Sequence, residues 1–356
     1  MKLYIHDLPA RYHRDVVAGE PKLQRDFFLV EHRVHQNLCE SPARTYDAEE
    51  AGLFFVPFYP SCIYAAHAYR TGLVLAKPSR PRRLRTDLHL LRCFGKMMSM
   101  LTAHPAWRRR GGRDHVFVFG QGRGPNLGYI WRRYRRQLQG SIVLGVEARP
   151  SEGLSAFNPA TDRVIPGYVP WYDLIEEVCK ESIERDLLLH FRGRAWGRVR
   201  GALFEHLRSS RDVLLSEDTR FQLGTEGRNL DLDEVRAYYR EMRRATFCLC
   251  PSGWSPWSRR FYEAILVGSI PIIIPGDFVP PFRERLDYSR FTLTVSAEEI
   301  PTLEARVRAI PQEQVQRMQG ALREVRSHFV YHAAPRQGDA GSMILEDLAG
   351  IAEGMA

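Results

Sequence analysis

The sequence predicts an α/β protein with two consecutive domains, each built around a mostly parallel sheet. Short apolar runs alternate with stretches whose apolar residues recur at helical spacing, a pattern typical of parallel sheets with helices on both faces. The chain has 356 residues, enough for two domains that each bury a core. Its hydrophobic fraction of 44% is that of an ordinary globular protein.

The first domain is expected over residues 1–160, where the alternation is clear. Its apolar runs have the length of strands, and two longer stretches between them have apolar positions at helical spacing. We expect strands at Leu3–His6, Gly52–Pro57, His115–Phe119 and Ser141–Val146, and helices over 23–38 and 84–103.

The second domain is expected over residues 161–311. Asp231, with Glu234 three positions later, predicts a capping box at the start of a helix. A helical tail over 312–356 follows this domain and could pack back on the first one. The other expected elements are a strand at Asp186–Phe191, a helix over 197–209, a strand near Phe291–Val295 and a helix over 302–309.

Residues 247–276 carry the clearest functional signal, because they form one predicted β-loop-α-β unit. Such a unit points the helix N-terminus at the crevice beyond the strand ends, where α/β proteins bind anions. Its parts are a strand at Phe247–Cys250, a break at Pro251-Ser252-Gly253, a helix from Ser258 to Val267 ended by Gly268, and a buried strand at Ile270–Ile274.

Two arginines, Arg259 and Arg260, lie in the first turn of this helix, where cations are unfavourable unless an anion pairs with them. Glu263 follows one turn later and could accept hydrogen bonds from sugar hydroxyls. Diphosphate plus ribose is therefore the expected ligand. The structural alternatives are two exposed surface cations and a glutamate favoured by the helix dipole.

The same stretch resembles the signature of the exostosin-type glycosyltransferases, glycosyltransferase family 47, and the resemblance spans roughly residues 2–310. Six ordered landmarks form a strong signal, although each alone would be weak. They are Lys2 to Pro9, Arg44-Thr45 with Ala51 to Phe58, Trp107 to Val118, Ile165 to Pro170, His190 to Gly193, and Pro280-Pro281-Phe282 after the signature.

This resemblance implies a GT-B glycosyltransferase architecture, with two Rossmann-like domains facing a cleft. It also implies an inverting, metal-independent transfer from a nucleotide sugar, expected to be a UDP-sugar, with the donor in the second domain. The family places a glutamate at the position of Glu263 against the nucleotide ribose, and Arg260 is the more typical match of the two arginines. No cofactor beyond the donor substrate is expected.

Further donor contacts are expected at the ends of two predicted strands. Backbone N–H groups of Ser252 and Gly253 could bind the diphosphate, although a plain turn would also explain them. Gly193 could let the backbone approach the ligand while Arg192 adds positive charge, and a structural ion pair of Arg192 is the alternative. Tyr168 could stack near the base, or it could be a core tyrosine.

The acceptor side offers several candidates for the catalytic base. Asp114 and His115 begin a predicted strand next to two glycines, and either could help to deprotonate an acceptor hydroxyl. The same turn could instead be a structural knot in which Asp114 pairs with an arginine. Asp7, together with His6, closes the first strand and is a comparable candidate, as is Glu147.

Asp231 and Asp233 match a metal-binding Asp-x-Asp pattern, but their place at a helix start favours capping. We therefore expect no obligatory metal. The six cysteines show no spacing typical of a zinc site, and a disulfide between distant pairs is left open.

The net charge of +9 is unevenly distributed, because residues 80–136 hold 15 Lys/Arg against 2 Asp/Glu. A solvated basic face would explain this segment, as would attraction of an anionic glycan or polysaccharide acceptor. Nucleic acid ranks last, because no nucleic-acid-binding motif is present. Pairing with another copy or another glycosyltransferase is also left open.

No apolar stretch is long enough to span a membrane, and no signal segment precedes the first strand. The resembled family normally carries an N-terminal anchor and acts in the Golgi lumen, so a truncation or an unusual soluble member is expected. The alternative function is a catalytically inactive, carbohydrate-binding partner of another glycosyltransferase.

Overall fold

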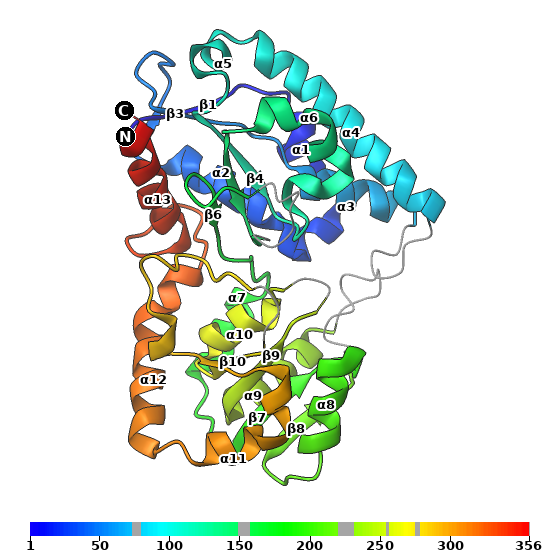
Figure 1. The fold of residues 1–356 in the computed structure, drawn as a ribbon, viewed down its shortest axis with the longest axis vertical. Helices are drawn as coiled ribbons and strands as arrows, with labels where there is room; N and C mark the ends of the chain where they lie inside the picture. Colours follow the sequence, from blue (N-terminus) through cyan, green and yellow to red (C-terminus); the bar gives the residue numbers. More distant parts are fainter. Residues whose placement is uncertain (73–79, 149–156, 220–230, 254–255, 275–277, 356) are drawn as a thin grey trace. The chain divides into compact units, whose positions relative to one another are not determined.

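The computed structural model describes residues 1–72, 80–148, 157–219, 231–253, 256–274 and 278–355. The chain divides into two compact units, which are coloured along the sequence in Figure 1. Unit 1 comprises Met1–Pro170, Val279–Phe282 and Val330–Ala356, and unit 2 comprises Trp171–Phe278 and Arg283–Phe329. Each unit contains one parallel sheet flanked by helices, so the expected fold class of two Rossmann-like α/β units is confirmed.

The sheet of unit 1 has the order β2-β1-β3-β4-β5-β6, and its described pairs are all parallel. In the register, Tyr4 lies opposite Phe54, and Phe54 lies opposite His115. The strands are β1 (Leu3–Ile5), β2 (Arg44–Thr45), β3 (Leu53–Phe55), β4 (His115–Phe119), β5 (Ile142–Gly145) and β6 (Arg163–Val164).

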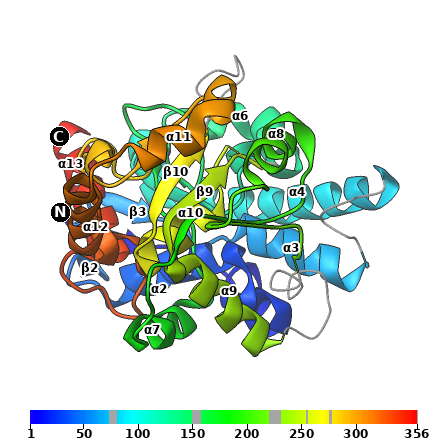
Figure 2. The same cartoon turned by 90° about the horizontal axis from the view of Figure 1, so that it is seen from below.

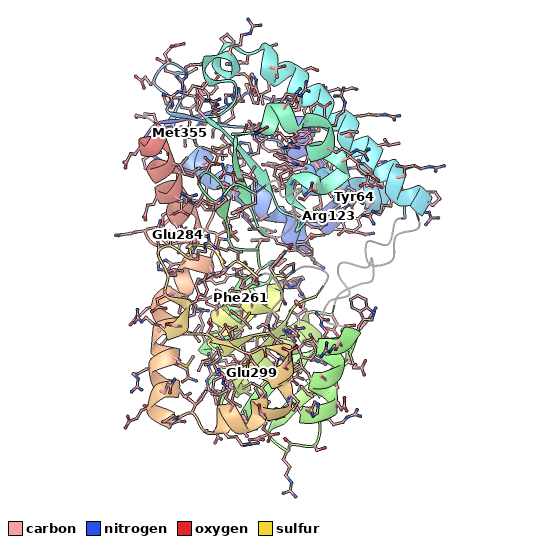
Figure 3. The ribbon with its side chains drawn as sticks, in the orientation of Figure 1. Tyr64, Arg123, Phe261, Glu284, Glu299 and Met355 are labelled. Carbon is pink, nitrogen blue, oxygen red and sulfur yellow. The ribbon has the colours of Figure 1, made fainter. Side chains whose placement is uncertain are left out.

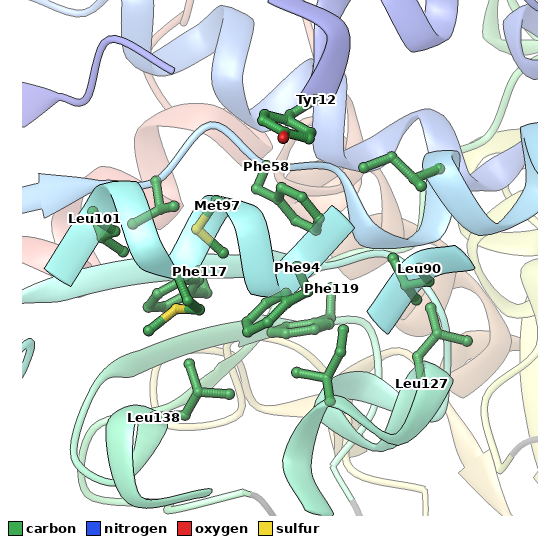
Figure 4. Close-up of a cluster of buried hydrophobic side chains, with 14 of the residues drawn as sticks. Tyr12, Phe58, Leu90, Phe94, Met97, Leu101, Phe117, Phe119, Leu127 and Leu138 are labelled. Atoms are coloured by element: carbon green, nitrogen blue, oxygen red, sulfur yellow. The ribbon is translucent and has the colours of Figure 1, made fainter. Parts of the chain in front are cut away.

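Helices α3, α4 and α6 of unit 1 surround one apolar cluster, in which Phe94 and Met97 of α4 meet Phe117 and Phe119 of β4 (Figure 4). Helix α2 contacts β2, β4 and helix α13. The helices of unit 1 are α1 (Arg14–Ala18), α2 (Val30–Glu40), α3 (Pro60–Arg70), α4 (Arg80–Ala103), α5 (Pro105–Arg110), α6 (Ile130–Leu138) and α13 (Ala340–Met355).

One expected helix is shorter than the sequence pattern suggested. Residues 23–38 were expected to form a single helix, but α2 begins only at Val30, after two short 3₁₀ turns. The carboxylate of buried Asp26 accepts a hydrogen bond from the Phe28 N–H, 3.1 Å away. Local bonds of this kind compete with a continuous helix, which explains the break.

The sheet of unit 2 has the order β11-β10-β9-β7-β8, and its described pairs are also parallel. Figure 2 shows β9 and β10 between α7 and α9 on one side and α8 and α11 on the other. The elements are α7 (Tyr172–Lys180), β7 (Leu187–Arg192), α8 (Gly197–Leu207), β8 (Val213–Ser216), α9 (Leu232–Arg244), β9 (Ala245–Pro251), α10 (Arg259–Val267), β10 (Ile270–Ile274), β11 (Leu293–Thr294), α11 (Leu303–Arg308) and α12 (Gln312–Val325).

The predicted β-loop-α-β unit is confirmed as β9, α10 and β10. Ser258 occupies the N-cap position of α10, and Gly268 ends the helix with a positive φ of 79°, which a residue with a side chain adopts only with strain. Helix α10 is buried along almost its whole length, with Phe261 in the interior of unit 2 (Figure 3). Asp231 caps α9 by accepting the Asp233 N–H, as expected.

The last segment of the chain belongs to unit 1. The Asn37 side-chain amide on α2 donates to the carbonyl oxygens of His332 and Ala333. A Cβ at Gly341 of α13 would lie 2.5 Å from the Asn37 amide oxygen, so only glycine allows this approach. All six cysteines are free thiols.

Candidate functional site

Both sheets reverse their strand order at one point, between β1 and β3 in unit 1 and between β7 and β9 in unit 2. The connections on the two sides of such a point leave in opposite directions and open a crevice at the carboxyl ends of the strands. Ligands of open parallel sheets bind in that crevice. A predicted site residue is therefore well placed to bind a ligand if it lies at one of these two switch points.

Four predicted donor residues lie at the switch point of unit 2. Strand β7 ends at Arg192 and is followed by Gly193, whereas β9 ends at Pro251 and is followed by Ser252 and Gly253. Both strands end one residue later than the predicted ends at Phe191 and Cys250, and the backbone of both loops lies at the expected edge.

Each of the two glycines lies against a guanidinium group. A Cβ at Gly193 would lie 3.2 Å from Arg260 Nη2 and 3.0 Å from the Phe191 ring. A Cβ at Gly253 would lie 3.0 Å from Arg200 Nη2. The missing side chains thus leave both arginines close to the backbone of the switch point.

Arg260 and Arg200 form the cationic part of this site. Arg260 is only 5% exposed, donates to the Arg192 carbonyl oxygen, and lies with Cζ 4.5 Å from the centroid of the Phe191 ring. Arg200 of α8 is half-buried, with Cζ 5.7 Å from the same ring. Burial and the charge of Arg260 lower the pKa of Arg200 to about 10. Neither arginine forms an ion pair with a residue that the structure describes, so this pair can bind a diphosphate.

The other two predicted cations are already paired with acids. Arg192 contacts Asp218 at 3.1 Å and Glu241 at 3.4 Å, the structural ion pair that the sequence left open. Arg259 Nε lies 2.7 Å from Glu263 Oε1. Of these four arginines, the two without an acidic partner among the described residues are Arg260, which the sequence singled out, and Arg200, which sequence analysis missed.

Glu263 is 1% exposed and accepts hydrogen bonds from two tyrosine hydroxyls of α9, Tyr238 at 2.9 Å and Tyr239 at 3.2 Å. Burial and the Glu263 charge raise the pKa of both hydroxyls, so they remain protonated donors. Sequence analysis did not assign either tyrosine to the site. A carboxylate offers about four acceptor positions, so Glu263 retains capacity for a ribose hydroxyl.

Tyr168 belongs to unit 1, whereas the other expected donor residues belong to unit 2. Its hydroxyl accepts a hydrogen bond from Arg33 Nη2 at 3.2 Å, and its ring packs edge-on against Tyr331. These contacts fit the core tyrosine that the sequence offered as the alternative to base stacking.

The switch point of unit 1 carries side chains that can accept a proton. Asp7 is exposed and lies two residues after the end of β1. His35 Nδ1 shares a hydrogen bond of 2.7 Å with the Tyr59 hydroxyl, which also lies 3.4 Å from His32 Nδ1, and His13 packs edge-on against His35. Burial lowers the pKa of His35 to about 3 and that of His32 to about 4. Sequence analysis missed this group, because its members come from separate segments without a shared motif.

Asp114 and His115, the first candidates for the catalytic base, lie elsewhere. Both are 0% exposed at the amino end of β4, the edge opposite to the switch point. His115 Nδ1 donates to Asp114 at 2.8 Å, and Arg109 contacts Asp114 at 3.2 Å. The Trp107 ring packs directly against the turn at Gly112, since a Cβ at Gly112 would lie 2.4 Å from this ring. The geometry favours the structural knot, in which Asp114 pairs with an arginine.

A cavity of about 720 Å³ also lies at the amino-end edge of unit 1, lined by Arg109, Arg110, Arg113, Gly140, Thr161 and Met355. Ligands of parallel sheets bind at the opposite edge, so this cavity does not belong to the candidate site. Within the described ranges, no group of three or more His, Cys, Asp or Glu side chains is arranged to hold a metal ion.

The fold and the two switch points define an α/β protein of two doubly wound units with an arginine-rich site in the second. The model of the Exostosin GT47 domain matches residues 1–310, and the chain belongs to this family of glycosyltransferases. No helix among the described residues is long and apolar enough to cross a membrane.

Several plant proteins are similar to this chain over nearly its whole length. "Probable beta-1,4-xylosyltransferase IRX10" of Arabidopsis thaliana is 28% identical and covers 98% of this chain and 82% of that protein. A "Probable glucuronosyltransferase" of Oryza sativa subsp. japonica is also 28% identical, over 98% of this chain and 81% of that protein. A crystal structure of UDP-N-acetylglucosamine 2-epimerase aligns with a TM-score of 0.31 at 9% identity, over 95% of this chain and 97% of that chain. This score is too low to show a shared fold.

Proposed function

We propose that this glycosyltransferase binds a UDP-sugar in unit 2 and transfers the sugar, with inversion, to a glycan or polysaccharide. The observation that supports the donor site is the switch point of unit 2, where Gly193 and Gly253 lie against the guanidinium groups of Arg260 and Arg200. Two cations beside the backbone of two glycines at a strand-order reversal suit a nucleotide diphosphate.

Each donor residue then has a separate role. Arg260 and Arg200 neutralise the charge that develops on the leaving diphosphate, the task that a metal ion performs in other enzymes. Gly253 donates its backbone N–H to the phosphates, whereas the Ser252 N–H already donates to the Ile274 carbonyl oxygen at 3.4 Å. Glu263 accepts a ribose hydroxyl. Because Glu263 is held by Tyr238 and Tyr239, its carboxylate is oriented before the donor arrives.

The relatives' names supply the sugars to test, xylose and glucuronic acid. UDP-xylose carries its sugar in an α linkage, so a β-1,4 product requires inversion at the anomeric carbon. The acceptor oxygen bonds to that carbon while the bond to the diphosphate breaks, and the electron pair leaves with UDP. The hydroxyl proton passes to a base of unit 1, for which Asp7 and the group around His32 at the switch point are our candidates.

The donor site is tested by thermal unfolding with UDP or GDP, each with and without EDTA. A ligand at ~100 times its Kd stabilises the fold by roughly 2.7 kcal/mol, which shifts the midpoint visibly. We expect stabilisation by UDP that EDTA leaves unchanged. Arg260→Gln should abolish it, whereas Arg306→Gln, which removes an exposed, ion-paired arginine of the same unit, should not. No shift with UDP would overturn the donor site.

Turnover is tested separately, by UDP release from UDP-xylose and UDP-glucuronic acid in the presence of a panel of oligosaccharides. The anomeric configuration of the product, read from its NMR coupling constants, decides between inversion and retention. UDP binding without release from any donor would instead favour a catalytically inactive, carbohydrate-binding partner of another glycosyltransferase.

A further inference from the structure

Segment 80–148 of unit 1 presents positive charge without compensating carboxylates at the surface. Its acidic residues are Asp87, Asp114 and Glu147, and all three are buried. Asp87 pairs with Arg83 at 3.9 Å and with Arg123 at 4.0 Å, and Arg123 lies beside the ring of Tyr64 (Figure 3). The acids thus neutralise inner arginines and leave the outer ones uncompensated.

The outer cations lie on two helices that contact one another. Helices α4 and α6 meet through the rings of Phe94 and Tyr134, whose centroids are 5.2 Å apart, and a Cβ at Gly95 would lie 2.5 Å from the Tyr134 hydroxyl. Cations flank both contact residues along their helices. The α4–α6 basic face consists of Arg85, Arg92, Lys96, Arg132, Arg133, Arg135 and Arg136.

All seven side chains of the α4–α6 basic face are exposed. Within the part of the chain that the structure describes, none of them forms an ion pair. Exposed cations in an ordinary solvated face are interspersed with acids, and this face has none of its own. Its natural partner is therefore an extended surface of negative charge.

Apolar side chains are exposed beside these cations. Leu84 is 49% exposed and Leu88, one turn later on α4, is 39% exposed, and exposed Tyr129 immediately precedes α6. The segment before Tyr129 packs on α4, since a Cβ at Gly128 would lie 2.8 Å from Leu90. Leucines next to arginines on an exposed helix are typical of binding at a lipid interface, where tyrosine is also favoured. A soluble anionic polysaccharide would gain little from aliphatic leucines.

We propose that the α4–α6 basic face binds an anionic lipid bilayer. The arginines and Lys96 contact the charged headgroups, and Leu84 and Leu88 enter the boundary with the acyl chains. Such binding would hold unit 1 at a membrane surface through side chains of a folded domain. It goes beyond the proposed function and does not depend on the donor site. The anionic polysaccharide expected from the sequence is the competing partner for the same residues.

Vesicle flotation tests this proposal with phosphatidylcholine vesicles that contain or lack phosphatidylserine. We expect the full chain to float only with phosphatidylserine and to dissociate as salt is raised, because surface charges are screened. Each basic residue near an anionic membrane contributes about fivefold to binding, from ~1 kcal/mol per residue. Replacing Arg132, Arg133, Arg135 and Arg136 together by Gln should therefore weaken binding by at least about a hundredfold.

A matched variant removes the same charge from unit 2, through Gln at Arg240, Arg290, Arg306 and Arg317. It should bind vesicles within about twofold of the natural chain. Leu84→Ser with Leu88→Ser should weaken binding by about tenfold while its salt dependence stays the same, because apolar burial is lost and charge is kept. Unchanged midpoints of thermal unfolding would show that the variants are folded.

Three outcomes would overturn the proposal. The first is no flotation with phosphatidylserine at low salt, and the second is equal loss of binding in both quadruple variants. The third is binding to a soluble polyuronate that the α6 variant loses, with no binding to vesicles, which would assign the face to an anionic polysaccharide instead.

Discussion

The switch points of the two units share one topology but differ in chemistry. In unit 2 the strand ends carry glycines against Arg260 and Arg200, whose charge persists at any physiological pH. In unit 1 the corresponding edge carries Asp7 and a group of histidines that burial keeps neutral. The fold thus fixes where ligands can bind, whereas the side chains at the strand ends decide whether the site binds an anion or accepts a proton.

The largest expected effect concerns the rigidity of the unit 2 site. Glu263→Ala removes the partner of half-buried Arg259 and the acceptor of two buried tyrosine hydroxyls, so the free energy of unfolding should fall by about 3–5 kcal/mol. Glu263→Gln should cost less, since its amide oxygen still accepts from the tyrosines. Urea titration measures both, and a loss below about 1 kcal/mol in the alanine variant would show that the network does not stabilise the unit.

Arg260→Gln removes one of the two cations that distinguish the switch point of unit 2 from that of unit 1. Loss of charge-assisted bonds to a diphosphate should weaken UDP binding by roughly a hundredfold, from about 3 kcal/mol. Calorimetric titration with UDP provides the measurement. Arg306→Gln serves as the control, and equal affinity in both variants would remove Arg260 from the site.

The histidines of unit 1 should make its stability depend on pH, which the arginines of unit 2 cannot do. The pKa of His35 is about 3 in the folded chain and about 6.5 when unfolded. The contribution of neutral His35 to the free energy of unfolding is therefore present above pH 6.5 and is lost as pH falls toward 3. Between pH 7 and pH 5, His35→Gln should gain about 2 kcal/mol relative to the natural chain. Urea titrations at both pH values test this, and a constant difference would contradict it.

The smallest effects are expected at the two glycines. In Gly193→Ala the new methyl group meets the Phe191 ring and Arg260, whereas in Gly253→Ala it meets only the mobile end of Arg200. We expect UDP affinity to fall by about tenfold in the first variant and by less in the second, with little change in unfolding midpoint. A larger loss at Gly253 would show that its backbone, and not Arg200, is the more important contact.

Sequence analysis located most of the strands and the helix α10, and it named most residues of the proposed donor site, because these depend on local apolar patterns and on turn residues near one another. It missed Arg200 and Tyr238, since no local pattern shows which side chains of other helices reach α10. It also placed Asp114 and His115 among the candidates for the base without showing at which edge of the sheet they lie. Their motif predicts a strand start, and in a parallel sheet that start lies at the edge opposite to the ligand.

The division of the chain also bears on how the protein is made. Unit 1 begins the sequence, yet Val330–Ala356 belongs to it and follows all of unit 2. Domains generally fold as units while the ribosome is still adding residues. Unit 2 can therefore complete its core first, while the α2 surface that α13 buries stays uncovered. Unit 1 is therefore translated first but completes its fold last. In a nascent chain halted near residue 329, Asn37 would lack its contact with α13.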